Sequence, residues 1–139
     1  MKSLRLLYAI LLMSIALGAS ARKKKTDKSD DYTPVYAFGI GMSFNDSIVY
    51  YTDIQCLDSA KVGKYNVLEM RSDYSNQFGN YIESRMHKSN YSTMTVYELK
   101  EGKAEKNYRK FLKKYENNSA NMVLVKKDDF AFSKPHNQE

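Results

Sequence analysis

Few side chains in this sequence are of the types that catalyse reactions. The chain of 139 residues contains one cysteine, Cys56, and two histidines, His87 and His136. A thiol beside an imidazole can act as a nucleophile with its base, but nothing in the sequence brings these residues together. Cys56 fits a small buried residue that closes a strand, and His87 falls at the end of a predicted helix, where an imidazole meets the helix dipole favourably. We therefore predict no catalytic cysteine or histidine.

Carboxylates are the other side chains that could act as a general acid and base. The candidates fall at predicted strand ends or turns, where aspartate is common for conformational reasons. They are Asp46, Asp53, Asp58, Asp128 and Asp129. The sequence has no Gly-x-Ser-x-Gly elbow, no phosphate-binding glycine loop and no His-Glu-x-x-His motif. We therefore predict a binding module without a metal ion or cofactor, and keep a small hydrolase that uses these carboxylates as the alternative.

Two groups of side chains are candidates for a binding surface. Tyr51, Asp53 and Gln55 alternate along a predicted strand, so an aromatic ring would lie beside hydrogen-bonding groups, although cross-strand packing produces the same pattern. The second group is a set of basic residues on the polar side of a predicted helix, interrupted by glutamates, which suits an acidic partner, a peripheral contact with an anionic membrane, or simple solvation. The members of this second group are Lys103, Lys106, Lys110 and Lys113. We expect the partner to be an envelope protein or a glycan.

Nucleic acid is not expected among the partners. The net charge is +6 for the whole chain, and loss of Lys2 and Arg5 with a cleaved leader would lower it to +4. This excess of positive charge is modest, and no aromatic side chains are interleaved with the basic helix face.

The most regular pattern in the sequence predicts a β-hairpin at residues 35–56. Large side chains such as Phe38 and Ile40 alternate with small ones such as Gly39 and Gly41, which predicts a strand with one bulky and one small face. The small face should let a helix or another backbone approach closely. A turn at 45–46 and a β-branched and aromatic run at 47–55 complete the hairpin.

Two amphipathic helices and further strands follow the hairpin. Apolar stripes predict helices from 72 or 73 to 86 and at 102–117, and β-prone runs predict strands at 67–71, 92–99, 121–126 and 130–132. We expect an α+β fold: a two-layer sandwich in which a mixed β-sheet, starting with the N-terminal hairpin, carries both helices on one face. A single cysteine cannot form an internal disulfide, so apolar packing must hold the domain together.

The N-terminus has the pattern of an export signal. Positive residues precede an apolar stretch at 6–17, which is shorter than the roughly 20 residues that span a bilayer, and small residues end at Ala21. We predict export to the periplasm or the medium after cleavage near Ala21. The resulting division is a signal peptide at 1–21, a disordered basic and polar linker at 22–34, a single α+β domain at 35–132 and a polar tail at 133–139.

The segment VYAFGIGMSFNDSIVYYTDIQCLDSA at 35–60, followed by a Tyr-Ser-Asn-Gln-Phe helix start at 74–78, resembles small exported proteins of unknown function from gut Bacteroidetes. The resemblance covers residues 35–132 and implies a Gram-negative envelope or secreted setting, but no activity or cofactor. In that setting, the triplets Asp46-Ser47-Ile48 and Asp58-Ser59-Ala60 are similar to the Asp-Ser/Thr-aliphatic acceptor of bacterial protein O-glycosylation. The resemblance therefore implies Ser47 and Ser59 as glycan attachment sites.

Overall fold

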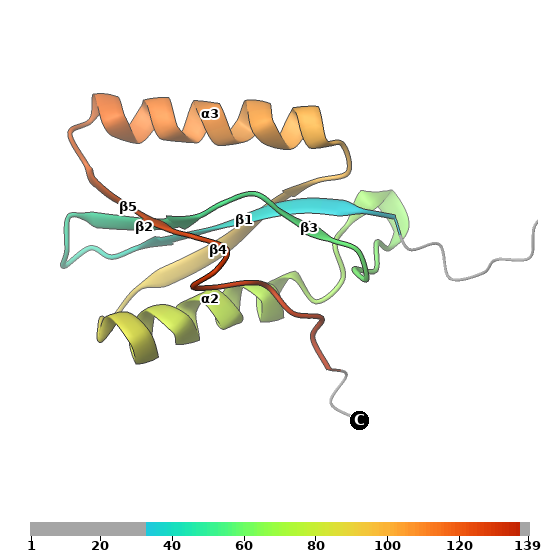
Figure 1. The fold of residues 1–139 in the computed structure, drawn as a ribbon, viewed down its shortest axis with the longest axis horizontal. Coiled ribbons are helices and arrows are strands. Elements are labelled where there is room, and N and C mark those ends of the chain that lie inside the picture. The colour runs from blue at the N-terminus through green and yellow to red at the C-terminus, as the bar shows by residue number, and fades with distance from the viewer. Residues whose placement is uncertain (1–32, 137–139) are drawn as a thin grey trace, which may run out of the picture. The chain divides into compact units, whose positions relative to one another are not determined.

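The β-sheet is built around a central strand that is buried on both faces. The computed structural model describes residues 33–136 (Figure 1). Its strands are β1 (Val35–Met42), β2 (Ile48–Thr52), β3 (Gln55–Leu57), β4 (Ser92–Glu98) and β5 (Asn121–Val125). β1 pairs antiparallel with β4 on one side and with β2 and β3 on the other, and β5 is added parallel to β2. β4 is thus one edge of the sheet, and β5 together with the short β3 forms the other. The predicted α+β class, mixed sheet and hairpin are confirmed.

Several predicted segments fall outside the part of the chain that the structure describes. These are the signal peptide at 1–21, residues 22–32 of the linker, and residues 137–139 of the tail. All described residues belong to one compact unit. Within 33–136, no helix has the length and apolar character that crossing a membrane requires.

The two helices lie on opposite faces of the sheet, so the prediction that both cover one face is wrong. α2 (Arg71–Met86) lies below the sheet in Figure 1 and α3 (Glu101–Asn117) lies above it. Phe38 of β1 packs with Phe111 of α3, whereas Tyr50 of β2 packs with Phe78 of α2. The reason is that both faces of β1 are apolar enough to be buried. The fold therefore has three layers, helix, sheet and helix.

The small face of β1 is where α2 approaches the sheet, as the sequence predicts. A Cβ atom added to Gly39 would lie 2.8 Å from Cδ1 of Phe78, and one added to Gly41 would lie 2.5 Å from Cδ1 of Ile82. Ordinary carbon atoms do not approach so closely, and Phe78 and Ile82 are both fully buried. The glycines therefore provide the space in which the apolar stripe of α2 sits.

A β-bulge interrupts the second strand of the hairpin. Ile40 pairs with Tyr51, but Ala37 pairs with Gln55. Two residues of β1 therefore face three residues of the neighbouring strand between these pairs, which is the definition of a bulge. Because side chains alternate between the faces of a strand, one extra residue reverses the side to which every later side chain points. Tyr51 and Gln55 consequently lie on opposite faces of the sheet.

The Thr52 hydroxyl bridges the backbone at the bulge. The amide of Gly39 donates a hydrogen bond to Oγ1 of Thr52 at 2.9 Å, and this hydroxyl donates to the carbonyl of Asp53 at 2.9 Å. Thr52 is completely buried, so an unpaired amide at this point would be destabilising. The side chain thus replaces a ladder contact that the bulge removes.

Two short strands predicted from β-prone runs are not formed. The run at 67–71 belongs to the start of α2 at residue 71 and to the loop before it. That loop has a 3₁₀ turn at Lys64–Asn66 and is closed by an isolated bridge between Val62 and Leu68. The segment at 130–132 is extended but unpaired, and it lies on the same side of the sheet as α2. In both cases apolar side chains anchor a connection to the core, and such anchors produce the same residue pattern as a short strand.

Candidate functional site

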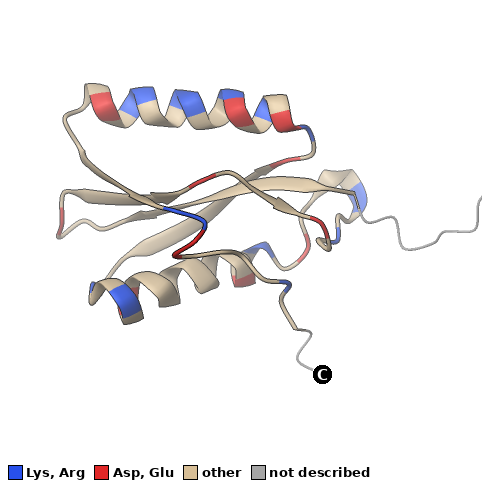
Figure 2. Cartoon of the chain, in the orientation of Figure 1, with Lys and Arg blue, Asp and Glu red and all other residues tan. Residues whose placement is uncertain are grey.

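The outer face of α3 carries the densest group of positive charges in the described domain. The helix packs its apolar stripe on β1, β4 and β5, with Ala104 and Phe111 buried. At 3.6 residues per turn, Lys106, Lys110 and Lys113 lie on the opposite side of the helix. All three lysines are exposed, and Figure 2 shows that basic residues recur along the whole length of α3. Among the described residues, none of these three lysines has an ion-pair partner.

The glutamates of α3 lie along one flank and do not interrupt the lysines, in contrast to the sequence-based interpretation. The helical period places Glu101, Glu105 and Glu116 on one side of the crest formed by Lys106, Lys110 and Lys113. The other side carries Lys103 and Lys114. The basic surface is therefore continuous, and we call these five lysines together with Arg109 the basic face of α3.

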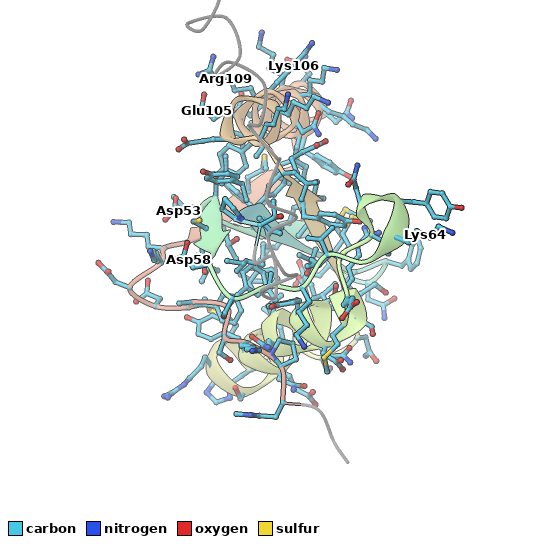
Figure 3. The ribbon with its side chains drawn as sticks, turned by 90° about the vertical axis from the view of Figure 1, so that its right-hand side faces the viewer. Asp53, Asp58, Lys64, Glu105, Lys106 and Arg109 are labelled. Atoms are coloured by element: carbon cyan, nitrogen blue, oxygen red, sulfur yellow. The ribbon has the colours of Figure 1, made fainter. Side chains whose placement is uncertain are left out.

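The orientation of the two flanks follows from their contacts with the sheet. Burial, and then the negative charge of Glu116, raises the pKa of Tyr51 of β2, which is consistent with a glutamate flank that lies towards β2. Lys103 lines a small depression with Tyr97 and Glu98 of β4, so the lysine flank lies towards β4. Figure 3 shows Glu105 and Arg109 on one side of α3 and Lys106 on the other.

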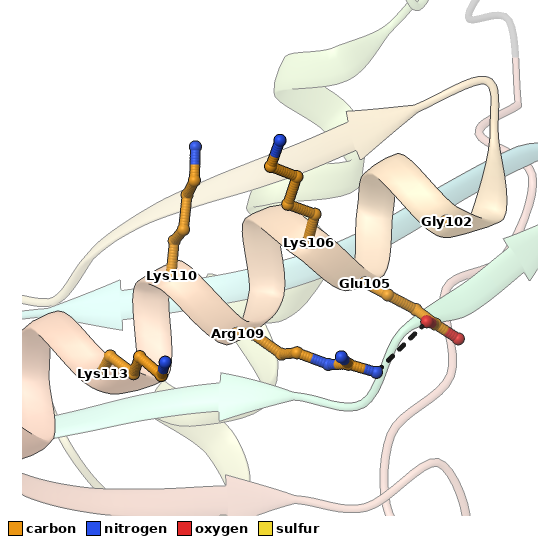
Figure 4. A pocket seen from close by; sticks show the side chains of 6 residues that line it. All are labelled: Gly102, Glu105, Lys106, Arg109, Lys110 and Lys113. Carbon is orange, nitrogen blue, oxygen red and sulfur yellow. Dashed lines mark hydrogen bonds and ion pairs between the residues drawn. The ribbon is translucent and has the colours of Figure 1, made fainter.

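A shallow depression of about 260 Å³ follows the outside of the basic face. It is lined by Gly102, Lys106, Arg109, Lys110 and Lys113 together with Glu105 (Figure 4). The one ion pair within it joins Nη2 of Arg109 to Oε2 of Glu105 at 3.5 Å, and both side chains are at least half exposed. Such a pair is weak in water, so it neutralises little of the charge on the basic face.

The structure does not bring Tyr51, Asp53 and Gln55 together, so the predicted strand-face site is not formed. The ring of Tyr51 packs under α3 against the ring of Phe111 at 5.7 Å. Oδ2 of Asp53 accepts a hydrogen bond from the amide of Lys127 at 3.2 Å. Gln55 is only 3% exposed and lies on the opposite face. The bulge between Tyr51 and Gln55 is the physical reason, because it reverses the alternation on which the prediction depends.

Three of the strand-end carboxylates, Asp46, Asp53 and Asp58, each accept a hydrogen bond from a different partner. Asp46 forms an ion pair with Lys88 at 2.9 Å in the turn after β1, and Asp58 accepts a hydrogen bond from the thiol of Cys56 at 3.0 Å. Figure 3 shows Asp53 and Asp58 on the side of β2 and β3. Within residues 33–136, no three acidic, cysteine or histidine side chains are grouped in a way that could hold a metal ion. This geometry offers no support for the carboxylate hydrolase.

Cys56 is exposed in the structure, not buried as its sequence context indicates. It lies in β3, whereas His87 follows the last residue of α2 in a left-handed conformation with φ of 52°. The hydrogen bond to Asp58, and then burial, raises the pKa of the Cys56 thiol. A raised pKa keeps the thiol protonated and therefore a poor nucleophile.

Replacement of Asp46 by asparagine is expected to remove a pH-dependent part of the stability. The hydrogen bond from Lys88, and then that from the amide of Ile48, lowers the pKa of Asp46 below its usual value of 3.8. A carboxylate whose pKa is lowered by folding stabilises the protein above its unfolded-state pKa and loses that effect as pH falls through its folded-state pKa. D46N should therefore be slightly less stable than the wild type near neutral pH, with the difference closing below pH 3.8.

Urea unfolding of both proteins across a series of pH values measures this difference. The pair is partly exposed, so the difference is small throughout. A difference that stays constant down to the acid limit of the folded protein contradicts the assigned role of the carboxylate.

Two further depressions lie away from the basic face of α3. One, of about 430 Å³, is lined by Ser59, Tyr74 and His136 among others. The other, of about 310 Å³, is mostly polar and lies between α2 and the start of β4, with Asn76, Glu83 and Asn90 among its lining residues. The first joins residues 59–74 with the C-terminal segment at 134–136, so only the tertiary structure reveals it, whereas the second is formed by the continuous stretch at 76–93.

The two serines named as glycan attachment sites are both exposed. Ser47 directly precedes β2, where its Oγ accepts a hydrogen bond from Asn121 at 3.3 Å, and Ser59 lies in the turn after β3. Attachment needs an accessible hydroxyl, which both positions offer. Modification of these serines stays a prediction.

No family model matches this chain, and neither does a curated protein or a solved structure.

Proposed function

We propose that this protein is an exported binding module that holds an acidic glycan against the basic face of α3. The observation that supports this most is the sorting of charge across the helix, with lysines on the crest and one flank and glutamates confined to the other. From Lys103 to Lys113 the row extends for about 15 Å along the helix axis. A surface of this kind attracts a linear polymer that carries repeated negative charges.

The composition of the basic face favours a flexible polymer over a partner with one fixed geometry. Five of its six cations are lysines, and Arg109 is the only arginine. A lysine ammonium acts as a compact point charge, whereas arginine forms directed, bidentate contacts. The contact is therefore electrostatic and tolerant of movement along the helix.

Insertion into a membrane is less well supported than contact with a polymer. A helix that lies in a bilayer surface buries apolar side chains beneath its basic residues. The large apolar side chains that are exposed lie elsewhere, at Phe44, Tyr65, Val67, Met94, Val123 and Leu124. The apolar stripe of α3 is used in the core against the sheet, so it does not supply a membrane-facing surface.

Charge reversal at Lys106, Lys110 and Lys113 is expected to abolish retention on immobilised heparin, a sulfated polysaccharide. The wild type should be retained at low salt and released as salt screens the contact. The matched control replaces Lys61, Lys64 and Lys127, all outside α3, by glutamate and changes the net charge equally. This control should keep most of the retention.

Equal loss of retention in both triple variants contradicts the proposal, because it means that net charge alone governs binding. Vesicles rich in phosphatidylglycerol provide the second arm of the experiment. Binding to vesicles without retention on heparin also contradicts an acidic glycan and favours a peripheral membrane contact.

A further inference from the structure

The two edges of the sheet are protected to different degrees. At the β4 edge, Nε of Arg71 donates a hydrogen bond to the carbonyl of Thr95 at 2.9 Å, and the guanidinium lies over the ring of Tyr97 at 5.5 Å. A charged side chain placed in this way blocks the approach of another strand. Among the described residues, β5 pairs only with β2, and its sequence, NMVLV, contains no charge and no proline.

The β5 edge also exposes apolar side chains on both faces of the sheet. Met122 packs with residues of the α3 side and Val125 with residues of the α2 side. By the alternation of a strand, Leu124 then points to the α3 side and Val123 to the α2 side. Leu124 is 39% exposed and Val123 is 37% exposed. An uncharged strand edge with apolar residues on both faces is a template for pairing with another strand.

We propose that β5 pairs antiparallel with β5 of a second copy of this chain, forming a two-fold symmetric dimer with a continuous sheet. An interface of this symmetry must be complementary to itself. With Val123 on the axis, Val123 lies opposite Val123 of the second copy, and Met122 lies beside Leu124 of the second copy. Each apolar side chain at the edge thereby meets another apolar side chain on the same face.

The charges next to β5 are complementary under the same symmetry. The register that pairs Val123 with itself places Lys126 opposite Ala120 of the second copy. If the alternation of β5 is continued, Lys126 is on the α3 side, where Glu116 precedes Asn117, the last residue of α3, on the glutamate flank. Lys126 of each copy therefore lies towards Glu116 of the other copy, and the two-fold symmetry forms this contact twice.

The dimer places both basic faces on one side of the assembly. Antiparallel pairing of identical edges has its two-fold axis perpendicular to the sheet, so the two α3 helices lie above the same face. This consequence rests on the proposed function: two basic faces bind one acidic polymer more tightly than one face does. The pairing of β5 itself does not depend on any ligand.

Sedimentation equilibrium of the purified chain without ligand tests the dimer. We expect the wild type to reach twice the mass of one chain at about 100 µM or below, corresponding to a weak but specific association. V123K and V123E should each be monomeric, because like charges would lie directly opposite each other. An equimolar mixture of V123K and V123E should restore the twofold mass, because a lysine then faces a glutamate across the axis.

M94K is the matched control, because Met94 is an apolar residue of similar exposure, 43%, on the β4 edge. It should sediment as the wild type does, and circular dichroism confirms that each variant is folded. A monomeric wild type throughout the concentration range overturns the proposal and leaves the β5 edge for a different chain. A dimer that V123K leaves intact overturns it as well.

Discussion

Replacement of Gly39 by alanine is expected to lower the free energy of unfolding by about 2 kcal/mol. Alanine in a strand is normally more favourable than glycine by roughly 0.5–1 kcal/mol. Here the added Cβ would lie 2.8 Å from Cδ1 of Phe78 and 3.3 Å from Cζ of Phe132. Phe78 is completely buried and cannot move aside without disturbing α2. The sign of the effect is therefore opposite to the one that strand propensity predicts.

Urea unfolding of the wild type, G39A and G102A measures this effect. Gly102 lies in the first turn of α3, and an added Cβ there meets no atom within 4 Å. G102A should therefore be as stable as the wild type or up to about 1 kcal/mol more stable. The double variant G39A/F78L should recover part of the loss, because the smaller side chain makes room for the new methyl group. A G39A protein as stable as the wild type contradicts the close approach of α2.

Replacement of Gln55 by leucine is expected to destabilise the protein by about 3 kcal/mol. The Gln55 amide Nε2 donates to the carbonyl of Phe130 at 3.0 Å, and Oε1 accepts from the amide of Phe132 at 2.8 Å. Leucine is similar in size, so Q55L leaves little cavity, but it leaves a buried carbonyl and a partly buried amide without a partner. The segment at 126–133 should then detach, exposing the two phenylalanines that pack against α2.

Q77L is the matched control for Q55L. Gln77 holds Ser133 by the same pair of contacts, with Nε2 donating to the carbonyl at 2.8 Å and Oε1 accepting from the amide at 2.9 Å. These contacts are exposed, so water can replace them and the loss should be below about 1 kcal/mol. Trypsin cleavage after Lys126 and Lys127 should be faster in Q55L than in Q77L. Equal cleavage of the two variants contradicts the anchoring role of Gln55.

The α3 lysines share a face, as the sequence predicts, whereas Tyr51 and Gln55 do not. This contrast shows which site predictions the sequence could support. The lysines belong to one helix, so the period of 3.6 residues and the apolar stripe place them on a shared face without further information. The group around Tyr51 and Gln55 depends on an uninterrupted period of two. A bulge adds one residue without any glycine or proline to mark it, so the alternation is lost in a way that the residue types do not indicate.

The side of the sheet on which each helix lies is a second property that the local pattern does not contain. The alternation in β1 correctly predicts a bulky face and a small face. It also predicts that a helix or another backbone approaches the small face, but it does not identify which of the two helices lies there. Only the contacts of Gly39 and Gly41 show that this helix is α2, and these contacts depend on residues about 40 positions away in the sequence.

The amino-acid sequence by itself determined the hairpin, the two amphipathic helices, the α+β class and the presence of a lysine-rich helix face. Each of these follows from a short periodic pattern, because a strand or helix repeats its side-chain directions every few residues. The three-layer arrangement, the bulge, the burial of Gln55 and the contrast between the two sheet edges were decided only by the tertiary structure. They arise where distant segments compete for the same apolar surface and the same backbone hydrogen bonds, and that competition has no local signature in the chain.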